Sequence, residues 1–343
     1  IIDEGDKNSN IEVNIQRLSN DTYFKIHDIN STLVKQDTNI LSNTLDYTYQ
    51  DKDLFFGSNA SVFEDTSKLD RTRWEYSVPI TFEKNLFADD QFGNLSFASN
   101  IRIRNYDVNK RTDLLVNDFK WDSKKWINNL GFENHFESLI KATSYRADNT
   151  IEFKTDNANS ELSGVVGFFS KLNLYKNDVD KGNIYSLTPK MMTRYAPGHM
   201  RRITGGRLKY SNLFDLTKVS HIDVIENGFS TTLGFDFKKN DYDLTNGIGK
   251  EKFSFSAGQV ISEEENKDIP STTSLDQRFS DIVGVSSYNI NDNIGLKYNF
   301  AIDQGYKELN GGQNPPSSLM KCISVSYTHL RAHETREDLV CRV

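Results

Sequence analysis

Histidine and cysteine side chains are the groups of this 343-residue chain best suited to catalysis or metal binding. A nucleophilic enzyme holds a Ser or Cys beside a base, and a metalloprotease carries two histidines in an H-E-x-x-H motif. Neither that motif, a G-x-S-x-G turn nor a P-loop occurs in the sequence. The histidines before residue 321 are scattered, at His27, His135, His199 and His221. We therefore expect no catalytic residue, no cofactor and no metal, and predict that the protein is not an enzyme.

The last residues differ in style from the rest of the chain. Both cysteines and two of the six histidines fall after residue 320, at Cys322, His329, His333 and Cys341. A Cys/His metal site is one interpretation, and a short amphipathic helix with a disulfide is another. We favour a third, because "SYTHLRAHETREDLVCR" resembles a translated sequencing-adapter artefact. The sequence thus predicts a domain over residues 1–320 and a non-native tail over residues 321–343.

Charged residues exclude one class of partner and suggest one weak site. The net charge is −7 and the pI is near 5.5, so nucleic-acid binding is not expected. The run Glu263, Glu264 and Glu265 has the carboxylates that Ca²⁺ prefers. It lacks the regular ligand spacing of an EF-hand, and we interpret it as a solvated loop.

Most of the chain alternates apolar and polar residues, as strands with two different faces do. In "WEYSVPITF", for example, Trp74, Tyr76, Val78, Ile80 and Phe82 share one face. Similar stretches are "IEVNIQR" (11–17), "LSNTLDYTY" (41–49), "LSFASNIRIR" (95–104) and "IGLKYNFAI" (294–302). Several reach nine or ten residues, which is longer than usual soluble strands and close to the length of a tilted membrane strand.

The connections between these strands fall into two classes. Short turns are expected at "QDKD" (50–53), "DSKK" (122–125) and "NDN" (291–293), and long polar loops at residues 176–183, 238–251 and 262–278. Short turns at one rim and long loops at the other are typical of outer-membrane barrels. The predicted fold class is all-β: an antiparallel transmembrane β-barrel of about 14–16 strands. A soluble β-sandwich or β-solenoid, which also alternates, is the alternative.

Two further observations concern the membrane and the chain ends. No run approaches the ~18 apolar residues of a transmembrane helix, a test that leaves transmembrane β-barrels open. The first residues, "IIDEGDKNSN", are polar and acidic and contain no signal peptide. We expect the chain to be an internal piece of a longer protein, so that the barrel is incomplete.

One stretch departs from the period of two. In "NLFDLTKVSHIDVIENG" (212–228), Leu213, Leu216, Val219, Ile222 and Ile225 recur at every third position. The run has many poor helix formers, and a period of three does not keep one face of a 3.6-residue helix. We predict an ordered connector at a barrel rim.

This stretch and the strands around it resemble one family. "LTPK" (187–190), then Leu213–Phe214, "TKVSHIDVIENG" (217–228) and "LGF" (233–235) are similar to motifs in the C-terminal barrel of the LPS-assembly protein LptD (OstA/Imp) family, in alphaproteobacterial-like form. The chain departs from the family pattern at His221 and Val224, and lacks the family's cysteines. The signature positions, which we expect to be structural, are Pro189, Arg194, Pro197, Leu213, Phe214, Ser220, Asp223, Ile225, Gly228 and Gly234.

The resemblance implies a function and a set of partners. It implies an outer-membrane translocon that inserts lipopolysaccharide into the outer leaflet, without catalysis in the barrel. It also implies partners: lipopolysaccharide, an LptE-like plug lipoprotein, outer-membrane lipids, and LptA-like bridge proteins that contact an N-terminal domain absent from this sequence. The alternatives are another outer-membrane barrel, such as a porin or TonB-dependent receptor, and a soluble secreted glycan-binding β protein.

Overall fold

A computed structural model describes ten segments of the chain. These are residues 2–4, 7–20, 40–106, 110–150, 158–178, 182–219, 221–243, 248–290, 294–303 and 321–327. Two compact units are present, one of residues 1–121 with 139–163 and one of residues 122–138 with 164–343. Among the described residues, no helix combines the length and the apolar character needed to cross a membrane.

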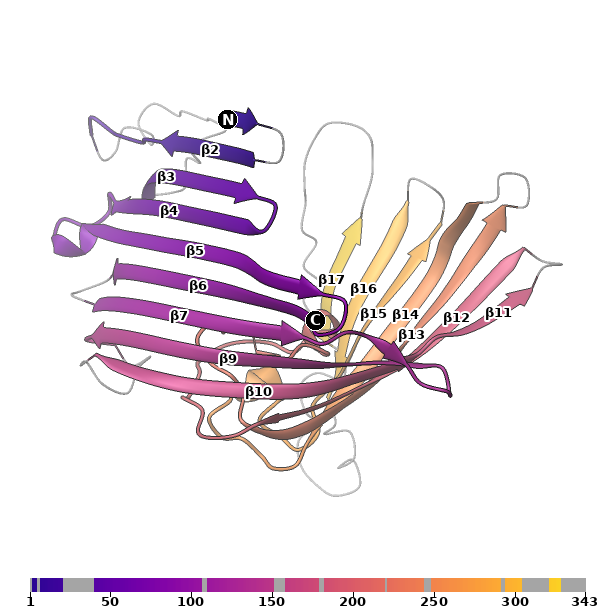
Figure 1. Cartoon of the computed structure of the whole chain (residues 1–343). Helices are drawn as coiled ribbons and strands as arrows, with labels where there is room; N and C mark the ends of the chain where they lie inside the picture. The colour runs from indigo at the N-terminus through magenta and orange to yellow at the C-terminus, as the bar shows by residue number, and fades with distance from the viewer. Residues whose placement is uncertain are drawn as a thin grey trace, which may run out of the picture. The chain divides into compact units, whose positions relative to one another are not determined.

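The first unit is built from long strands (Figure 1). They are β1 (Ile2–Glu4), β2 (Lys7–Asn14), β3 (Ile40–Asp51), β4 (Leu54–Asp65), β5 (Trp74–Asp89), β6 (Gly93–Tyr106), nearly all of β7 (Lys110–Asp122), and the second part of β9 (Phe132–Asp148). A 3-10 turn, η1 (Arg71–Arg73), precedes β5. Register places Val78 and Ile80 of β5 opposite Ile103 and Ile101 of β6, so apolar side chains share a face as predicted.

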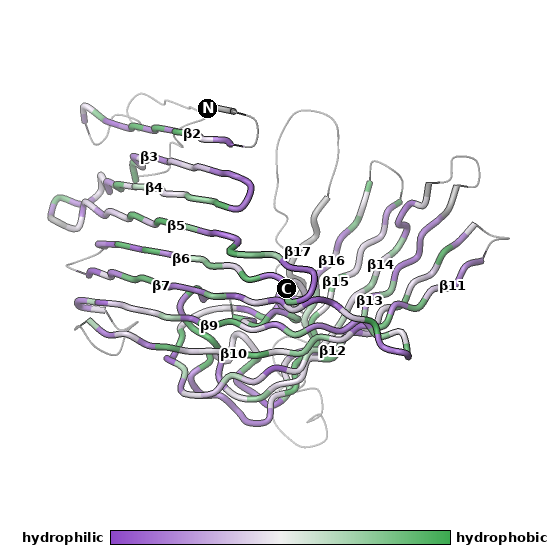
Figure 2. The backbone as a smooth tube through the Cα atoms, viewed as in Figure 1, coloured by the Kyte–Doolittle hydropathy of each residue, from purple (hydrophilic) through white to green (hydrophobic). Residues whose placement is uncertain are grey.

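The second unit contains the remaining strands and two 3-10 turns. They are β8 (Trp126–Ile127), the start of β9, most of β10 (Asn159–Leu172), β11 (Leu174–Asp178), β12 (Asn183–Ala196), β13 (Gly228–Asp243), β14 (Ile248–Ser262), β15 (Ile282–Asn289), β16 (Gly295–Ile302), β17 (Lys321–Tyr327), η3 (Tyr210–Asn212) and η4 (Ser271–Thr273). Hydrophobic and hydrophilic residues are mixed along the strands, as expected for a sheet whose two faces differ in polarity (Figure 2).

The predicted all-β antiparallel class is confirmed. The strands of the described chain belong to one sheet of 17 strands, whose neighbouring strands pair antiparallel, for example β12 with β13 and β13 with β14. β1 and β8 span only three and two residues, which leaves 15 longer strands, within the predicted 14–16. Each of the five alternating stretches named above lies wholly or mainly in a strand.

One predicted loop is wrong. Residues 238–251 were expected to form a long loop, but β13 continues to Asp243 and β14 begins at Ile248. Opposite charges explain why so polar a segment pairs as a ladder: Lys238 Nζ lies 2.9 Å from Glu251 Oε2, and Asp241 lies opposite Lys250. Such cross-strand charge pairs stabilise a hairpin.

The other connections agree with the predictions in part. β3 and β4 join through a tight turn at residues 52–53, and residues 262–278 lie mainly in an irregular loop. A second expected loop, 176–183, is also shorter than predicted, because β11 continues to Asp178, which pairs with Asn183 at the start of β12. Residues 179–181 of that loop and the turn at 291–293 lie outside the described residues. In the second unit the two long connections are residues 197–227, which follow β12, and residues 263–281, which follow β14. Both begin at the same edge of the sheet, because the ends of β12 and β14 both lie beside the start of β13.

Candidate functional site

The connector, defined as residues 197–227, packs against one face of the sheet in the second unit. It contains η3 and otherwise neither helix nor strand among its described residues. It joins Ala196, the end of β12, to Gly228, the start of β13, and these two residues pair with each other. It therefore begins and ends at one edge, as predicted. Its body, however, does not stay at a rim but covers the face that carries Met192 and Val260.

We call this side the covered face and the opposite side the open face. On the covered face the connector and the loop 263–281 form one apolar core with strands β14 and β15. Its buried members are Met200, Ile203, Leu208, Leu213, Val219, Val224, Val260, Ile269, Leu275 and Val283. The side chains that recur every third residue in the connector are thus mostly core, since Leu213, Leu216, Val219 and Ile225 are buried.

Two paired glycines let the connector approach the sheet closely. Gly234 of β13 lies opposite Gly258 of β14. A Cβ atom at Gly258 would lie 2.6 Å from Leu213 Cδ2, and one at Gly234 would lie 2.9 Å from Phe214 Cζ. A Cβ at either position would also lie 2.7 Å from a backbone carbonyl oxygen of the neighbouring strand, which cannot move aside as a side chain can, so glycine is needed at each position. Leu213 and Phe214 fill the space that two side chains would otherwise occupy.

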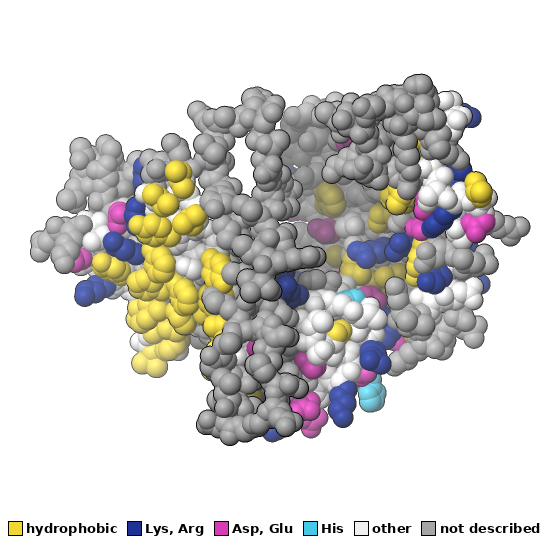
Figure 3. Space-filling model, turned by 180° about the vertical axis from the view of Figure 1, so that it is seen from behind, with side chains coloured by type: hydrophobic (Ala, Val, Ile, Leu, Met, Phe, Trp, Pro, Cys, Tyr) yellow, Lys and Arg dark blue, Asp and Glu magenta, His cyan; other side chains and the backbone are white. Residues whose placement is uncertain are grey.

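The open face has the opposite character. Residues that alternate with the covered ones are apolar and exposed: Leu187, Met191, Tyr195, Phe229 and Leu233. Further along β13 and β14 aromatic rings face one another, with Phe235 5.9 Å from Phe255 and Phe237 6.2 Å from Phe253. The surface shows hydrophobic side chains gathered in a continuous area, apart from most charged ones (Figure 3). An apolar surface of this kind is suited to lipid contact.

Glu226 fastens the connector to itself and to β12. Its Oε1 accepts the backbone N–H of Lys218 at 2.8 Å and also that of Val219. Its backbone carbonyl accepts Arg194 NH2 at 2.5 Å, and the Arg194 guanidinium lies 3.8 Å from Glu226 Oε2. Both residues are only 4% exposed. A buried carboxylate that accepts backbone N–H groups can hold an irregular segment in one conformation.

Lys218 adds a second buried cation beside Arg194. It is 2% exposed, and its Nζ donates to the backbone carbonyl of Asp215 at 2.9 Å. Burial, and then the neighbouring positive charge of Arg194, lower the pKa of the Lys218 ammonium to about 7. Lys218 therefore exchanges its proton near neutral pH, unlike an exposed lysine.

Two more polar clusters hold the connector in place. Arg201 donates to Asp223, which closes the connector on itself, and His221 Nδ1 lies 3.8 Å from Asp223 Oδ1. Burial opposes ionisation of Asp223, but the adjacent His221 and Arg201 outweigh it and lower the pKa of that carboxyl. Near the middle of the connector, Tyr210 donates to Asp236 Oδ1 at 2.5 Å, and Lys190 pairs with the same carboxylate.

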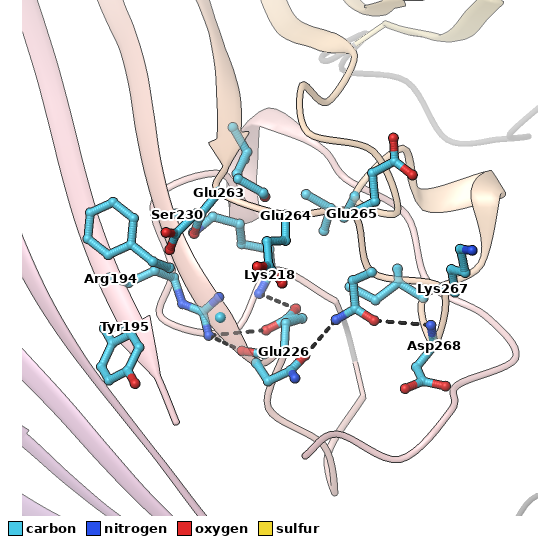
Figure 4. Close-up of a pocket in the computed structure, with 18 residues that line it drawn as sticks. Arg194, Tyr195, Lys218, Glu226, Ser230, Glu263, Glu264, Glu265, Lys267 and Asp268 are labelled. Atoms are coloured by element: carbon cyan, nitrogen blue, oxygen red, sulfur yellow. Dashed lines mark hydrogen bonds and ion pairs between the residues drawn. The ribbon is translucent and has the colours of Figure 1, made fainter. Parts of the chain in front are cut away.

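A pocket of about 470 Å³ opens between the end of the connector, the start of β13 and the loop 263–281. Arg194, Lys218 and Glu226 converge on one side of it, while Glu265, Lys267 and Asp268 lie toward the other (Figure 4). Asn266 Nδ2 donates to Asn227 Oδ1 at 2.7 Å and so joins the two loops. The pocket is polar. Arg194, Lys218 and Glu226 are buried, whereas Glu265, Lys267 and Asp268 are exposed.

This geometry, an all-β sheet with one exposed apolar face and one face covered by loops, agrees with a comparison with known families. The model of a family described as LPS transport system D, LptD, matches residues 4–338. The chain belongs to the LptD family. The resemblance proposed from the residues is thereby confirmed, and the family is one of lipopolysaccharide transport rather than a known enzyme family. No curated protein matches the chain.

The structure brings most of the LptD-family signature positions to the connector and its supporting strands. Leu213, Phe214, Asp223 and Ile225 lie in the connector, and Gly234 supports it. Arg194 is buried on the covered face, whereas Pro189 and Pro197 are exposed, on β12 and just after it. Gly228 has a φ of 95° at the start of β13. Ser220 lies outside the described residues.

Several residues that organise this site were not singled out in the sequence. They are Lys218, Glu226, Arg201 and Gly258. The first two fall within the stretch with period three, but nothing in their spacing shows that both are buried. Gly258 is some 45 residues from Leu213, so only the folded sheet brings them together.

Metal binding receives no support from the described residues, where no group of three or more His, Cys, Asp or Glu is arranged to hold an ion. The four residues of the tail cannot be assessed in this way, because His329, His333 and Cys341 lie outside the described residues. The backbone of Lys321–Tyr327 pairs with β16 as β17. That residues 321–343 are non-native stays a prediction.

Proposed function

We propose that this chain forms part of the wall of an outer-membrane translocon that inserts lipopolysaccharide into the outer leaflet. The observation that carries the proposal is the family match over residues 4–338. The sheet of the second unit supports it, because one face is apolar and exposed while the other is covered by loops that bury charged side chains such as Arg194 and Glu226. A wall between lipid and a polar passage needs those two faces.

The proposal extends to domains and partners. Residues 1–320 are the barrel domain, lipopolysaccharide is the cargo, and an LptE-like lipoprotein occupies the interior. LptA-like bridge proteins deliver the cargo from the periplasm. The protein resides in the outer membrane and moves lipopolysaccharide without chemistry of its own.

Depletion of the parent protein in a culturable relative tests this function. Surface lipopolysaccharide should fall while total lipopolysaccharide is maintained, and re-expression of the native gene should restore it. Depletion of an abundant porin in the same strain is the control, and it should leave surface lipopolysaccharide unchanged. If depletion of the parent also leaves it unchanged, the proposal is wrong and a passive channel is favoured.

A further inference from the structure

The buried side of the pocket contains more hydrogen-bond donors than acceptors. Within the described chain, Arg194 Nε and the Ser230 hydroxyl have no hydrogen-bond partner, although each residue is at least nine-tenths buried. Lys218 Nζ uses one of its N–H groups, for the carbonyl of Asp215. Buried polar groups normally have partners, so these unused donors require an explanation.

The charges of the buried side chains, like their unused donors, favour an anionic ligand. Of the charged side chains that line the pocket, only Arg194, Lys218 and Glu226 are buried, so the buried part of the lining carries one net positive charge when Lys218 is protonated. The acidic residues of the loop 263–281 that line the pocket, Glu263, Glu264, Glu265 and Asp268, are all exposed. Salt screens the interactions of exposed charges much more than those of buried charges. The two buried cations, Arg194 and Lys218, therefore dominate the recognition of a ligand that enters the pocket.

We propose that Arg194, Lys218 and Ser230 bind a phosphate group. A phosphate oxyanion accepts from a guanidinium, an ammonium and a hydroxyl at once, which would occupy the unused donors. Glu226 Oε2 has no hydrogen-bond partner in the described chain, and the O–H of a hydrogen phosphate would serve it. The phosphate comes either from the sugar headgroup of a glycolipid or from free phosphate. The glycolipid source rests on the proposed function, whereas the site itself does not.

Lys218 makes this binding depend on pH. The titratable groups around it are Arg194 on β12, Glu226 and Asp215 in the connector, and Glu137 on β9. An anion beside Lys218 favours its charged form, so binding should take up a proton near neutral pH. Sulfate keeps the same charge between pH 6 and pH 8, and it should therefore bind more tightly at pH 6 for reasons that lie in the protein alone.

The test is calorimetric titration of the full chain, folded in a non-ionic detergent. The probes are inorganic phosphate, sulfate, a phosphorylated lipid A glycolipid and its dephosphorylated form. We expect saturable phosphate binding that weakens about tenfold or more in Lys218→Met. Lys252→Met is the matched control, because Lys252 lies on β14 outside the pocket lining and contacts Tyr288 and Ile290. It should bind as the native chain does.

Each outcome supports or overturns the site. Preference for the phosphorylated glycolipid over its dephosphorylated form identifies the headgroup as the source, and equal glycolipid binding with saturable inorganic phosphate identifies free phosphate. If Lys218→Met does not fold, Ser230→Ala, which removes only a hydroxyl, takes its place and should also weaken binding. Absent phosphate binding, or equal affinities for the native chain and the folded variants, overturns the proposal. Such a result would not alter the surface lipopolysaccharide phenotype, which tests the function separately.

Discussion

Glu226 is the residue on which the connector depends most. One carboxylate oxygen holds two backbone N–H groups, from Lys218 and Val219, and the same residue neutralises Arg194. The net contribution of a buried ion pair is small, but removing one partner leaves the other charge buried and alone. The effect of a substitution here should therefore be much larger than the net contribution of the pair.

Glu226→Ala should lower the free energy of unfolding by about 3–5 kcal/mol, because Arg194 and two backbone N–H groups lose their acceptor. Urea unfolding in detergent, followed by tryptophan fluorescence, measures this. Glu265→Ala is the control on the exposed side of the pocket and should change stability by less than about 0.5 kcal/mol. Equal effects of the two substitutions would show that Glu226 does not anchor the connector.

The lowered pKa of Asp223 predicts how the stability of the connector changes in acid. Its pKa in the folded chain is lowered, so its contribution to stability is complete above the unfolded value of about 3.9 and is lost as the pH falls through the folded value. Stability should thus decline below about pH 4, and Asp223→Asn should remove part of that decline. Unfolding midpoints in urea between pH 3 and pH 7 check this, and identical pH profiles for both proteins would contradict it.

At the scale of elements, a glycine pair determines where the connector lies. Gly234 and Gly258 face each other across β13 and β14, and the connector places Leu213 and Phe214 directly over them. Backbone oxygens also lie close, since a Cβ at either position would come within 2.7 Å of a carbonyl oxygen of the neighbouring strand. The tolerance for any side chain at these two positions is correspondingly low.

Gly258→Val should destabilise the chain by about 1–3 kcal/mol or more, because overpacking shifts both the connector and the ladder. Gly205→Ala is the matched control within the connector itself, where an added Cβ would meet nothing within 4 Å. Urea unfolding should leave that control close to the native chain. If Gly258→Val is as stable as Gly205→Ala, the connector does not pack on the sheet as described.

The two faces of β13 give a second prediction for this element. Phe235 lies near the middle of the strand on the open face, and Phe229 lies at its start. In lipid vesicles Phe235→Arg should cost about 2–4 kcal/mol of stability and Phe229→Arg about 0–1 kcal/mol, because charge is least tolerated at the bilayer centre. Equal costs in vesicles, or no cost at Phe235, would mean that the open face does not contact lipid.

The strands could be predicted from the sequence more completely than the residues of the candidate site. A period of two directly records which side chains share a face, so stretches such as residues 74–82 and 95–104 were recognisable as strands. The hairpin at 238–251 was missed because its polar residues are paired across strands, as Lys238 is with Glu251. Leu213, Leu216, Val219 and Ile225 revealed that the connector was ordered. The pairing of Glu226 with Arg194 depends on tertiary packing that no local pattern records.

At the scale of the molecule, the family match and the two faces of the sheet support the same function. The LptD family match extends over both units, from residue 4 to residue 338. An exposed apolar open face and a loop-covered face with buried charges fit a wall with lipid on one side and cargo on the other. The central claim is that lipopolysaccharide passes along the covered face while other lipids contact the open face.

In-cell photo-crosslinking with pulse-labelled lipopolysaccharide tests that claim most directly. A photoreactive residue at Lys238, on the covered face and with a side chain 50% exposed, should form adducts that appear after the pulse and disappear during the chase. The same residue at Phe237, its neighbour on the open face, should give adducts that do not follow the pulse. Transient adducts at Lys238 alone are the predicted result. The absence of lipopolysaccharide adducts at Lys238, in cells that still export it, would contradict the account.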